Sequence, residues 1–300
     1  MPRGFEFKGI ITASLTPLTK KGKIKKDSVS QLVDFQLEHG INGFFLLGTF
    51  GEGVELSVFN RKEAAEAFLE HAKEKTPIIL HVGAQNTEDA VELAKHAKDL
   101  GVKAIGAVAP YFFKPDLRGL VKHYQAIGSA SDLPLFIYNN VGKQGYNITP
   151  TMFGEIAKGV PQVVGVKDTS YQIPQLQELI HKFGDRYQII VGGDSVVYAG
   201  FVVGAKAHIC GISNVFPELA VELYQSIAKG DYEKGKELQY KINDLREVFK
   251  SFKVDISPYK SALKLRGIDG GFMTPPLRDL EKEEEKKLIA ELKSTYPSHQ

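Results

Sequence analysis

The sequence predicts an α/β fold, a (β/α)8 TIM barrel with a C-terminal helical extension, and three observations support this. Short, β-rich apolar runs alternate with amphipathic stretches along most of the 300 residues. These runs are almost continuously apolar, as expected when a parallel sheet is covered on both faces. Eight strand-then-helix units follow one another without a shift in composition. A doubly wound open sheet is the alternative fold.

Each predicted strand and helix has its own pattern of apolar residues. The strand after residue 162 is an example, because Val163, Val164 and Val166 make a short branched run. The helical pattern 28–38 places its apolar side chains on one side, and 89–100 does the same with smaller residues. The predicted strands are 9–14, 43–47, 78–82, 104–108, 135–138, 163–167, 188–191 and 207–210, and the predicted helices between them are 28–38, 61–73, 89–100, 117–129, 151–158, 173–182 and 195–203.

Four helical patterns follow the eighth strand, at 219–228, 232–249, 258–265 and 281–292. One of them should be the eighth barrel helix, and the others form the extension. We therefore predict a barrel over residues 1–230 and a C-terminal helical extension over 231–300. The Glu/Lys run at 281–287 is predicted to be a solvated helix face.

Composition narrows the function. Apolar residues make up 43% and charged residues 25%, and the net charge is only +2 with both signs interspersed. We expect no nucleic-acid partner and no membrane partner. The single cysteine, Cys210, excludes an intramolecular disulfide and is predicted to be a core thiol. The first eight residues lack the apolar core of a signal peptide, so a cytoplasmic location is expected.

Lys167 is the strongest candidate for chemistry. It ends an apolar run, and a barrel places its active site at the carboxyl ends of the strands. Loss of hydration there lowers the pKa of an amine, and a neutral amine attacks carbonyl groups. Tyr138 ends the preceding strand and could exchange protons beside it. The alternatives are a lysine that reaches into solvent and a packed tyrosine.

Loops after three other strands supply candidate ligands for substrate. Gly48, Thr49 and Phe50 open a glycine-rich turn whose backbone N–H groups and hydroxyl suit a carboxylate. Gly193 and Asp194 follow the seventh strand. A phosphate site in the loops after strands seven and eight is one possibility, although Asp194 suits sugar hydroxyls better. The last strand and its loop add Ile209 and Ser213. Histidines such as His81, His123 and His208 show no metal-ligand spacing, and no metal is expected.

Together these motifs resemble the dihydrodipicolinate synthase / N-acetylneuraminate lyase family of pyruvate-dependent class I aldolases. The resemblance covers nearly the whole chain and rests most on the order and spacing of the Tyr138 and Lys167 motifs. It includes the turn 48–52 and the segments 109–112, 137–139, 165–168, 193–194 and 258–264. It implies that Lys167 forms a Schiff base with pyruvate, that Tyr138 transfers protons, and that Thr49 with the turn amides holds the keto-acid carboxylate.

Departures from the family pattern concern the second substrate. Dihydrodipicolinate synthases usually have Thr-Thr where this chain has Thr49-Phe50, and a tyrosine donated across a dimer interface where it has Phe112. Phenylalanine has no hydroxyl to pass a proton on, so the chain of three hydroxyl groups that relays protons in these enzymes is broken unless the neighbouring Tyr111 takes the place of that tyrosine. Lys143 stands where these enzymes use an arginine. In the sialic-acid lyase branch, the turn reads Gly-Ser-Thr-Gly-Glu, and an acidic residue stands where this chain has Ser195.

The resemblance therefore predicts a cofactor-free lyase that forms or cleaves a 2-keto-3-deoxy sugar acid, with pyruvate and an aldehyde as the small-molecule partners. One alternative is condensation of pyruvate with aspartate semialdehyde. Another is a barrel that binds keto acids without turnover, and a third is an enzyme acting on phosphorylated substrates through the loops after strands seven and eight. The resemblance also implies a homodimer or homotetramer.

Overall fold

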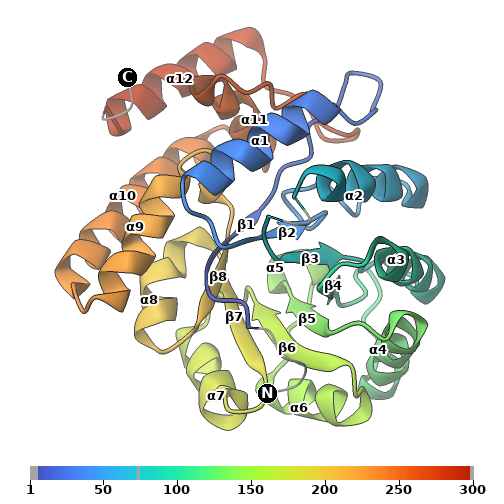
Figure 1. Cartoon of the computed structure of the whole chain (residues 1–300). Coiled ribbons are helices and arrows are strands. Elements are labelled where there is room, and N and C mark those ends of the chain that lie inside the picture. Colours follow the sequence, from blue (N-terminus) through green and yellow to red (C-terminus); the bar gives the residue numbers. More distant parts are fainter. Residues whose placement is uncertain (1–5, 73–74, 298–300) are drawn as a thin grey trace.

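The computed structural model describes residues 6–72 and 75–297, and its eight strands form one closed barrel (Figure 1). All neighbouring strands are parallel, and β1 pairs with β8 to close the sheet. This confirms the predicted barrel, and the alternative prediction of a doubly wound open sheet is wrong. The strands are β1 (Gly9–Ala13), β2 (Gly43–Leu46), β3 (Ile78–His81), β4 (Ala104–Val108), β5 (Leu135–Asn139), β6 (Val163–Asp168), β7 (Gln188–Gly192) and β8 (Ala207–Cys210).

Helices surround the barrel, and polar caps set several of their starts. The side chains of Asn86, Asp116 and Thr149 accept backbone N–H groups in the first turns of α3, α4 and α6. The eighth barrel helix is α9, which packs against β1. The barrel helices are α1 (Lys26–Glu38), α2 (Val58–Ala72), α3 (Thr87–Leu100), α4 (Leu117–Ser131), α6 (Pro150–Gly159), α7 (Ile173–Phe183), α8 (Val197–Val202) and α9 (Pro217–Ala228).

Two predicted helices are split in the structure, one short helix was not predicted, and one residue is not covered. The predicted helix 258–265 is an α-helix at Ser257–Ala262 followed by a 3-10 turn at Leu263–Arg266. The predicted helix 195–203 is split, because Asp194–Val196 forms a 3-10 turn before α8. The short helix α5 (Val141–Gln144) was not predicted, since four residues are too few to show a helical period. The last residue of the predicted helix 61–73 lies outside the described residues.

The interior of the barrel is filled by side chains at its amino-terminal end. Phe7 is buried there with its ring edge against Phe136, at a centroid distance of 5.7 Å. Phe45, Ile79 and Val164 belong to the same interior cluster. Because this end is packed, a ligand site within the barrel must lie toward the carboxyl ends of the strands.

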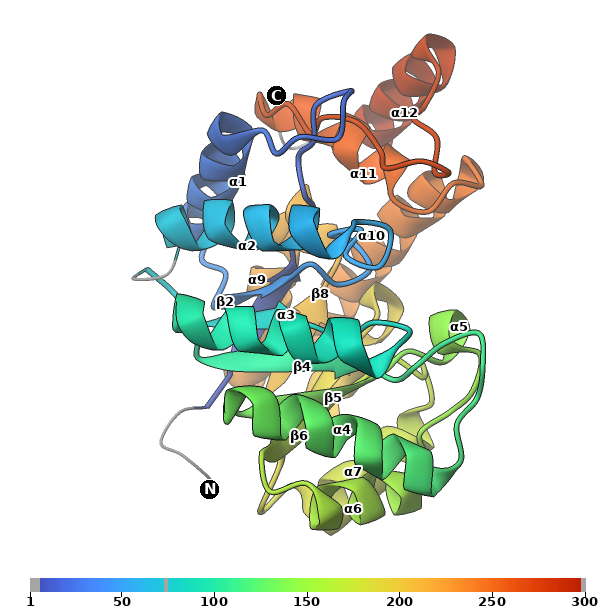
Figure 2. The ribbon, with the colours of Figure 1, turned by 90° about the vertical axis from the view of Figure 1, so that its right-hand side faces the viewer.

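The extension consists of α10 (Tyr232–Ser251), α11 (Ser257–Ala262) and α12 (Lys282–Thr295). Helix α10 packs against α8 and α9, and α12 packs against α10 and α11. In Figures 1 and 2, α11 and α12 lie on the same side of the molecule as α1. The division at residue 230 remains a prediction.

A buried ion pair joins the extension to the turn that follows β2. The Lys260 amine lies 2.5 Å from a carboxylate oxygen of Glu52, and both side chains are at most 2% exposed. The same amine donates to the carbonyl of Phe272, while the Thr274 N–H donates to the other Glu52 oxygen. These contacts connect the loop that carries Thr49 to the C-terminal extension.

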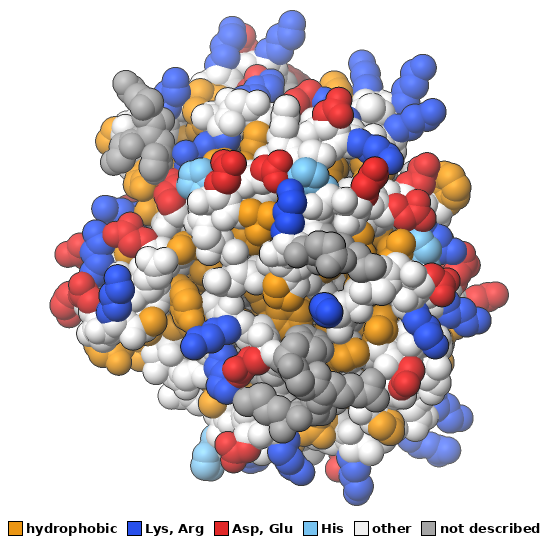
Figure 3. Space-filling view, in the orientation of Figure 1, with side chains coloured by type: hydrophobic (Ala, Val, Ile, Leu, Met, Phe, Trp, Pro, Cys, Tyr) orange, Lys and Arg blue, Asp and Glu red, His pale blue; other side chains and the backbone are white. Residues whose placement is uncertain are grey.

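The surface carries both acidic and basic side chains. Figure 3 shows basic and acidic side chains interspersed over the displayed face, in keeping with the small net charge. Within residues 6–72 and 75–297, no helix is both long and apolar enough to cross a membrane.

Candidate active site

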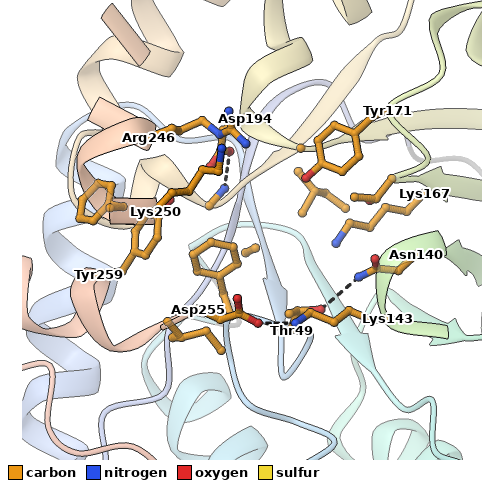
Figure 4. Close-up of a pocket in the computed structure, with 18 of the residues that line it drawn as sticks. Thr49, Asn140, Lys143, Lys167, Tyr171, Asp194, Arg246, Lys250, Asp255 and Tyr259 are labelled. Atoms are coloured by element: carbon orange, nitrogen blue, oxygen red, sulfur yellow. Dashed lines mark hydrogen bonds and ion pairs between the residues drawn. The ribbon is translucent and has the colours of Figure 1, made fainter. Parts of the chain in front are cut away.

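A cavity of about 460 Å³ opens at the carboxyl ends of the strands, between the barrel and α10. The loops after β2, β5, β6, β7 and β8 and the end of α10 all contribute to its walls (Figure 4). The predicted site residues that line it are Lys167, Tyr138, Thr49, Phe50, Lys143, Gly193, Asp194 and Ile209.

Lys167 lies between two aromatic rings. Its amine is 3.8 Å from the ring centroid of Tyr138 and 4.0 Å from that of Phe45, and the side chain is 5% exposed. Tyr138 and Lys167 are register partners on β5 and β6, which explains why the two side chains meet. Burial lowers the pKa of the Lys167 amine well below its ordinary value of 10.5, although the negative charge of Asp194 opposes this shift. The amine is therefore poised to be a neutral nucleophile.

Replacing Lys167 by methionine is expected to stabilise the fold at neutral pH. Because the amine has a lower pKa in the folded chain, the unfolded chain binds its proton more strongly, and stability rises with pH between the folded pKa and 10.5. We expect Lys167→Met to raise Tm at pH 7 by a few degrees, with a smaller gain at pH 10. Thermal unfolding at both pH values measures this, with exposed Lys286→Met as control. An unchanged Tm at pH 7 would contradict a costly buried amine.

The Tyr138 phenol is held by two polar partners. The Thr49 hydroxyl lies 3.3 Å from the phenol oxygen, and the Asn140 side-chain N–H donates to that oxygen at 2.8 Å. The Asn140 amide also reaches the Thr49 hydroxyl at 3.3 Å. Burial raises the pKa of Tyr138, while the hydrogen bonds from Thr49 and Asn140 lower it. Thr49, Tyr138 and Asn140 therefore form a hydrogen-bonded triad beside the Lys167 amine.

The sequence interpretation did not identify Asn140 as a site residue. Its hydrogen bond to Tyr138 predicts how a substitution would change kcat. Asn140→Leu keeps the approximate size but removes the donor, so the phenol oxygen loses a bond that stabilises its anion. We expect kcat to fall about tenfold and the alkaline limb of the rate profile, where Tyr138 ionises, to move to higher pH. The pH dependence of kcat is the measurement. A lowered kcat with an unmoved alkaline limb would show that Asn140 acts only in packing.

The turn after β2 has the geometry expected of an anion-binding loop. Leu47 and Glu52 adopt positive φ values of 57° and 54°, and the close approach of the backbone at Gly53 leaves no room for a Cβ. Within the described part of the chain, the N–H groups of Thr49 and Phe50 have no hydrogen-bond acceptor, whereas those of Glu52 and Gly53 close the turn. The two open N–H groups are available to a carboxylate.

Asp194 is turned toward β8. Its two carboxylate oxygens accept the N–H groups of Gly211 at 2.8 Å and Ile212 at 2.9 Å. A phosphate bound by the loops after β7 and β8 would need these donors, so the geometry speaks against that alternative. Ser213 does not line the cavity, and its buried hydroxyl donates to the Cys210 carbonyl and is hydrogen-bonded to the Thr12 hydroxyl.

Four of the predicted residues lie at the rim of the main cavity or outside it. Lys143 forms an ion pair with Asp255 at the rim of the cavity. Tyr111 lines a neighbouring cavity of about 210 Å³ that shares Thr49, Tyr138 and Asn140 with the main one. Phe112 is 84% exposed and lines neither cavity, and Gly48 also stays outside both.

The three histidines named above and the cysteine are parts of the packed structure. Burial lowers the pKa of His123 and His208 to about 4, and lowers that of His81 well below its usual value. His81 bridges the Leu47 carbonyl and the Val108 N–H. Cys210 is buried, as predicted. Among the residues that the structure describes, no group of three or more His, Cys, Asp or Glu side chains could hold a metal ion.

Comparisons with known proteins agree with this geometry. The sequence model of the dihydrodipicolinate synthetase family matches residues 6–295. A 4-hydroxy-tetrahydrodipicolinate synthase of Maridesulfovibrio salexigens is 32% identical over 289 residues, which are 96% of this chain and 98% of that protein. The dihydrodipicolinate synthase structure from Aquifex aeolicus is 27% identical, with a TM-score of 0.90 over 98% of this chain and 99% of that one. A catalytic-lysine mutant of Ruminococcus gnavus sialic acid aldolase is 29% identical, with a TM-score of 0.91 over 98% of each chain.

Proposed function

The chain belongs to the dihydrodipicolinate synthetase family of pyruvate-dependent class I aldolases, and we propose that it forms or cleaves a 2-keto-3-deoxy sugar acid through Lys167. The observation that carries the role of Lys167 is its buried amine, held against the Tyr138 ring at the carboxyl end of β6. One relative of similar fold, the Ruminococcus gnavus sialic acid aldolase, is described as a catalytic-lysine mutant, and this supports a reaction that depends on a lysine.

The reaction follows from the positions of these groups. The neutral Lys167 amine attacks the ketone carbon of pyruvate, and loss of water gives an iminium. Removal of a proton from the methyl carbon gives an enamine, which attacks the aldehyde carbon and forms the new C–C bond. Hydrolysis then releases the product and the free amine. In the reverse direction, the iminium accepts the electrons of the C–C bond that breaks.

Tyr138 and Thr49 supply the proton transfers and the orientation. The raised pKa keeps the Tyr138 phenol protonated at neutral pH, so it can donate to the oxygen that leaves as water. Thr49 adjoins that phenol, and its turn offers two open N–H groups to the pyruvate carboxylate. Because Thr49 and Lys167 line the same cavity, we propose that a carboxylate bound there directs the ketone toward the Lys167 amine.

The choice of a sugar acid rests on how the second half of the cavity is built. Lys143, which stands where dihydrodipicolinate synthases carry an arginine, is engaged by Asp255. Phe50, in place of their second threonine, packs edge-on against Tyr259 at a centroid distance of 4.9 Å. These contacts weaken the case for aspartate semialdehyde. That aldehyde remains the second candidate, because curated relatives are named 4-hydroxy-tetrahydrodipicolinate synthases.

One experiment tests the chemistry and the substrate class in sequence. Borohydride reduction with pyruvate should leave a stable adduct on Lys167, identified by peptide mass. An activity panel then compares cleavage of 2-keto-3-deoxy sugar acids with condensation of pyruvate and aspartate semialdehyde. An unmodified mass at saturating pyruvate sinks the Schiff-base role. A clear preference for aspartate semialdehyde replaces the sugar-acid proposal, and an adduct without turnover on any aldehyde supports a binding protein.

We also propose an assembly and a cellular location for the chain. Phe112 and Phe113 are 84% and 73% exposed and touch edge to face at 4.9 Å, which is an apolar surface suited to burial against a second copy. A homodimer or homotetramer would cover it. A cytoplasmic location is in keeping with a single cysteine, since no intramolecular disulfide can form.

A further inference from the structure

One face of α10 closes the side of the cavity opposite the reactive lysine. Arg246, Phe249 and Lys250 line the cavity, and their spacing of three and four residues places them on one face of α10. Lys253 lines the same cavity from the turn that directly follows the helix. In Figure 4, Lys167 lies at the right of the cavity, and Arg246 and Lys250 lie at the left with Tyr259. We call Arg246, Lys250 and Lys253 the basic face of α10.

The acidic groups of the same cavity do not neutralise this face. Asp255 is paired with Lys143, and Asp194, the other carboxylate among the described residues that line this cavity, can offset only one of the three positive charges. Within residues 6–72 and 75–297, Arg246 and Lys253 form no ion pair with a carboxylate. Lys250 pairs only with Glu247, one turn away on the exposed side of the helix. The cavity therefore has an excess of positive charge at the end far from the Schiff-base position.

Such an arrangement recognises a negative charge on a bound molecule. Cations that converge on one cleft repel one another until an anion enters, and the low-dielectric walls strengthen the attraction. The pyruvate carboxylate does not meet this need, because it is placed at the Thr49 turn beside Lys167. The charge must belong to the other end of the substrate.

We propose that the basic face of α10 binds an anionic group, a phosphate or a second carboxylate, at the far end of the aldehyde or of the sugar acid that yields it. This inference rests on the aldolase function proposed above. It names the substrate class more narrowly, as sugar acids or aldehydes that carry a terminal anion. Arg246 supplies a planar donor pair for two oxygens, while the lysines act as point charges.

The test compares aldehydes that differ in charge. Condensation with pyruvate is measured for glyceraldehyde, glyceraldehyde 3-phosphate and succinic semialdehyde, using the full chain. The double variant Arg246→Gln/Lys253→Gln is compared with Lys236→Gln/Lys241→Gln, which removes two charges from α10 outside the cavity. We expect the wild type to prefer an anionic aldehyde by about tenfold or more in kcat/KM. The first double variant should lose that preference while changing glyceraldehyde by less than about threefold, and the control pair should keep it. The favoured anion, phosphate or carboxylate, identifies the terminal group.

Two further measurements protect the test against misfolding or slow turnover. For the wild type, kcat/KM of the preferred anionic aldehyde should fall as salt rises from about 50 to about 500 mM, while that of glyceraldehyde stays level. Inorganic phosphate or succinate should bind the borohydride-reduced pyruvyl enzyme in calorimetry, and the double variant should lose that binding. Equal kcat/KM for charged and neutral aldehydes, or no binding of either anion, overturns the proposal. A pyruvate adduct on Lys167 in that case leaves the aldolase function standing.

Discussion

Lys167→Ala is expected to abolish turnover, with kcat falling by roughly four orders of magnitude or more. We propose that this amine forms the covalent bond to pyruvate, and the other described lysines that line the cavity, Lys143, Lys250 and Lys253, are exposed. The fold should persist, because the residue removed is a desolvated amine rather than a core anchor. Steady-state kinetics and the mass of the borohydride-treated protein measure both effects.

A matched variant separates chemistry from packing. Lys167→Ala opens a void between Phe45 and Tyr138, whereas Lys167→Met fills it with an apolar chain. Both should be inactive and adduct-free, while circular dichroism shows a native fold. If either variant kept more than a tenth of wild-type turnover, Lys167 would not be the Schiff-base residue.

Tyr138→Phe is expected to lower kcat about a hundredfold or more, because it removes one hydroxyl and nothing else. That hydroxyl is the central member of the Thr49–Tyr138–Asn140 triad, so its loss leaves the Asn140 donor and the Thr49 hydroxyl without their common partner. The ring that packs against Lys167 remains. Adduct formation with pyruvate should therefore be slowed but not abolished, which time-resolved borohydride trapping measures.

Tyr146→Phe is the control for this change. Its hydroxyl is buried like that of Tyr138 and donates to the Pro110 carbonyl at 2.7 Å, but it lines neither cavity. Removing this hydroxyl should lower the free energy of unfolding by about the contribution of one hydrogen bond, and kcat should stay within about threefold of the wild-type value. A change under threefold in Tyr138→Phe as well would exclude the phenol as the proton-transferring group.

The fold was predictable because the barrel repeats one simple signal. Each strand is a short apolar run, and errors were confined to the ends, as at Asp168, which extends β6 by one residue beyond the predicted strand. The break between Asp194 and α8 was not visible, because nothing in the apolar pattern distinguishes a 3-10 turn from a first helical turn.

The site was predictable only where chain position fixes spatial position. Strand order makes β5 and β6 neighbours, so the meeting of Tyr138 and Lys167 follows from the sequence. Asn140 and the basic face of α10 did not follow. Asn140 lies one residue beyond β5, where the loop direction decides its contacts, and Arg246 approaches from a helix about 80 residues after Lys167 in the chain. The prediction that Ser213 binds substrate is not supported by its place in the fold.

The buried pair of Glu52 and Lys260 limits how this enzyme can be shortened or recombined. A fragment that ended with α9 would contain every strand, yet the Glu52 carboxylate beside the Thr49 turn would lose both its cation and the N–H group of Thr274. We therefore expect a shortened chain to keep the native Thr49 turn only if it runs past Thr274, whose N–H donates to the second oxygen of Glu52. Grafting the turn onto another barrel would likewise require the lysine and its segment to be moved with it. The helical appendage is in this sense part of the turn that carries Thr49, although more than two hundred residues separate them in the chain.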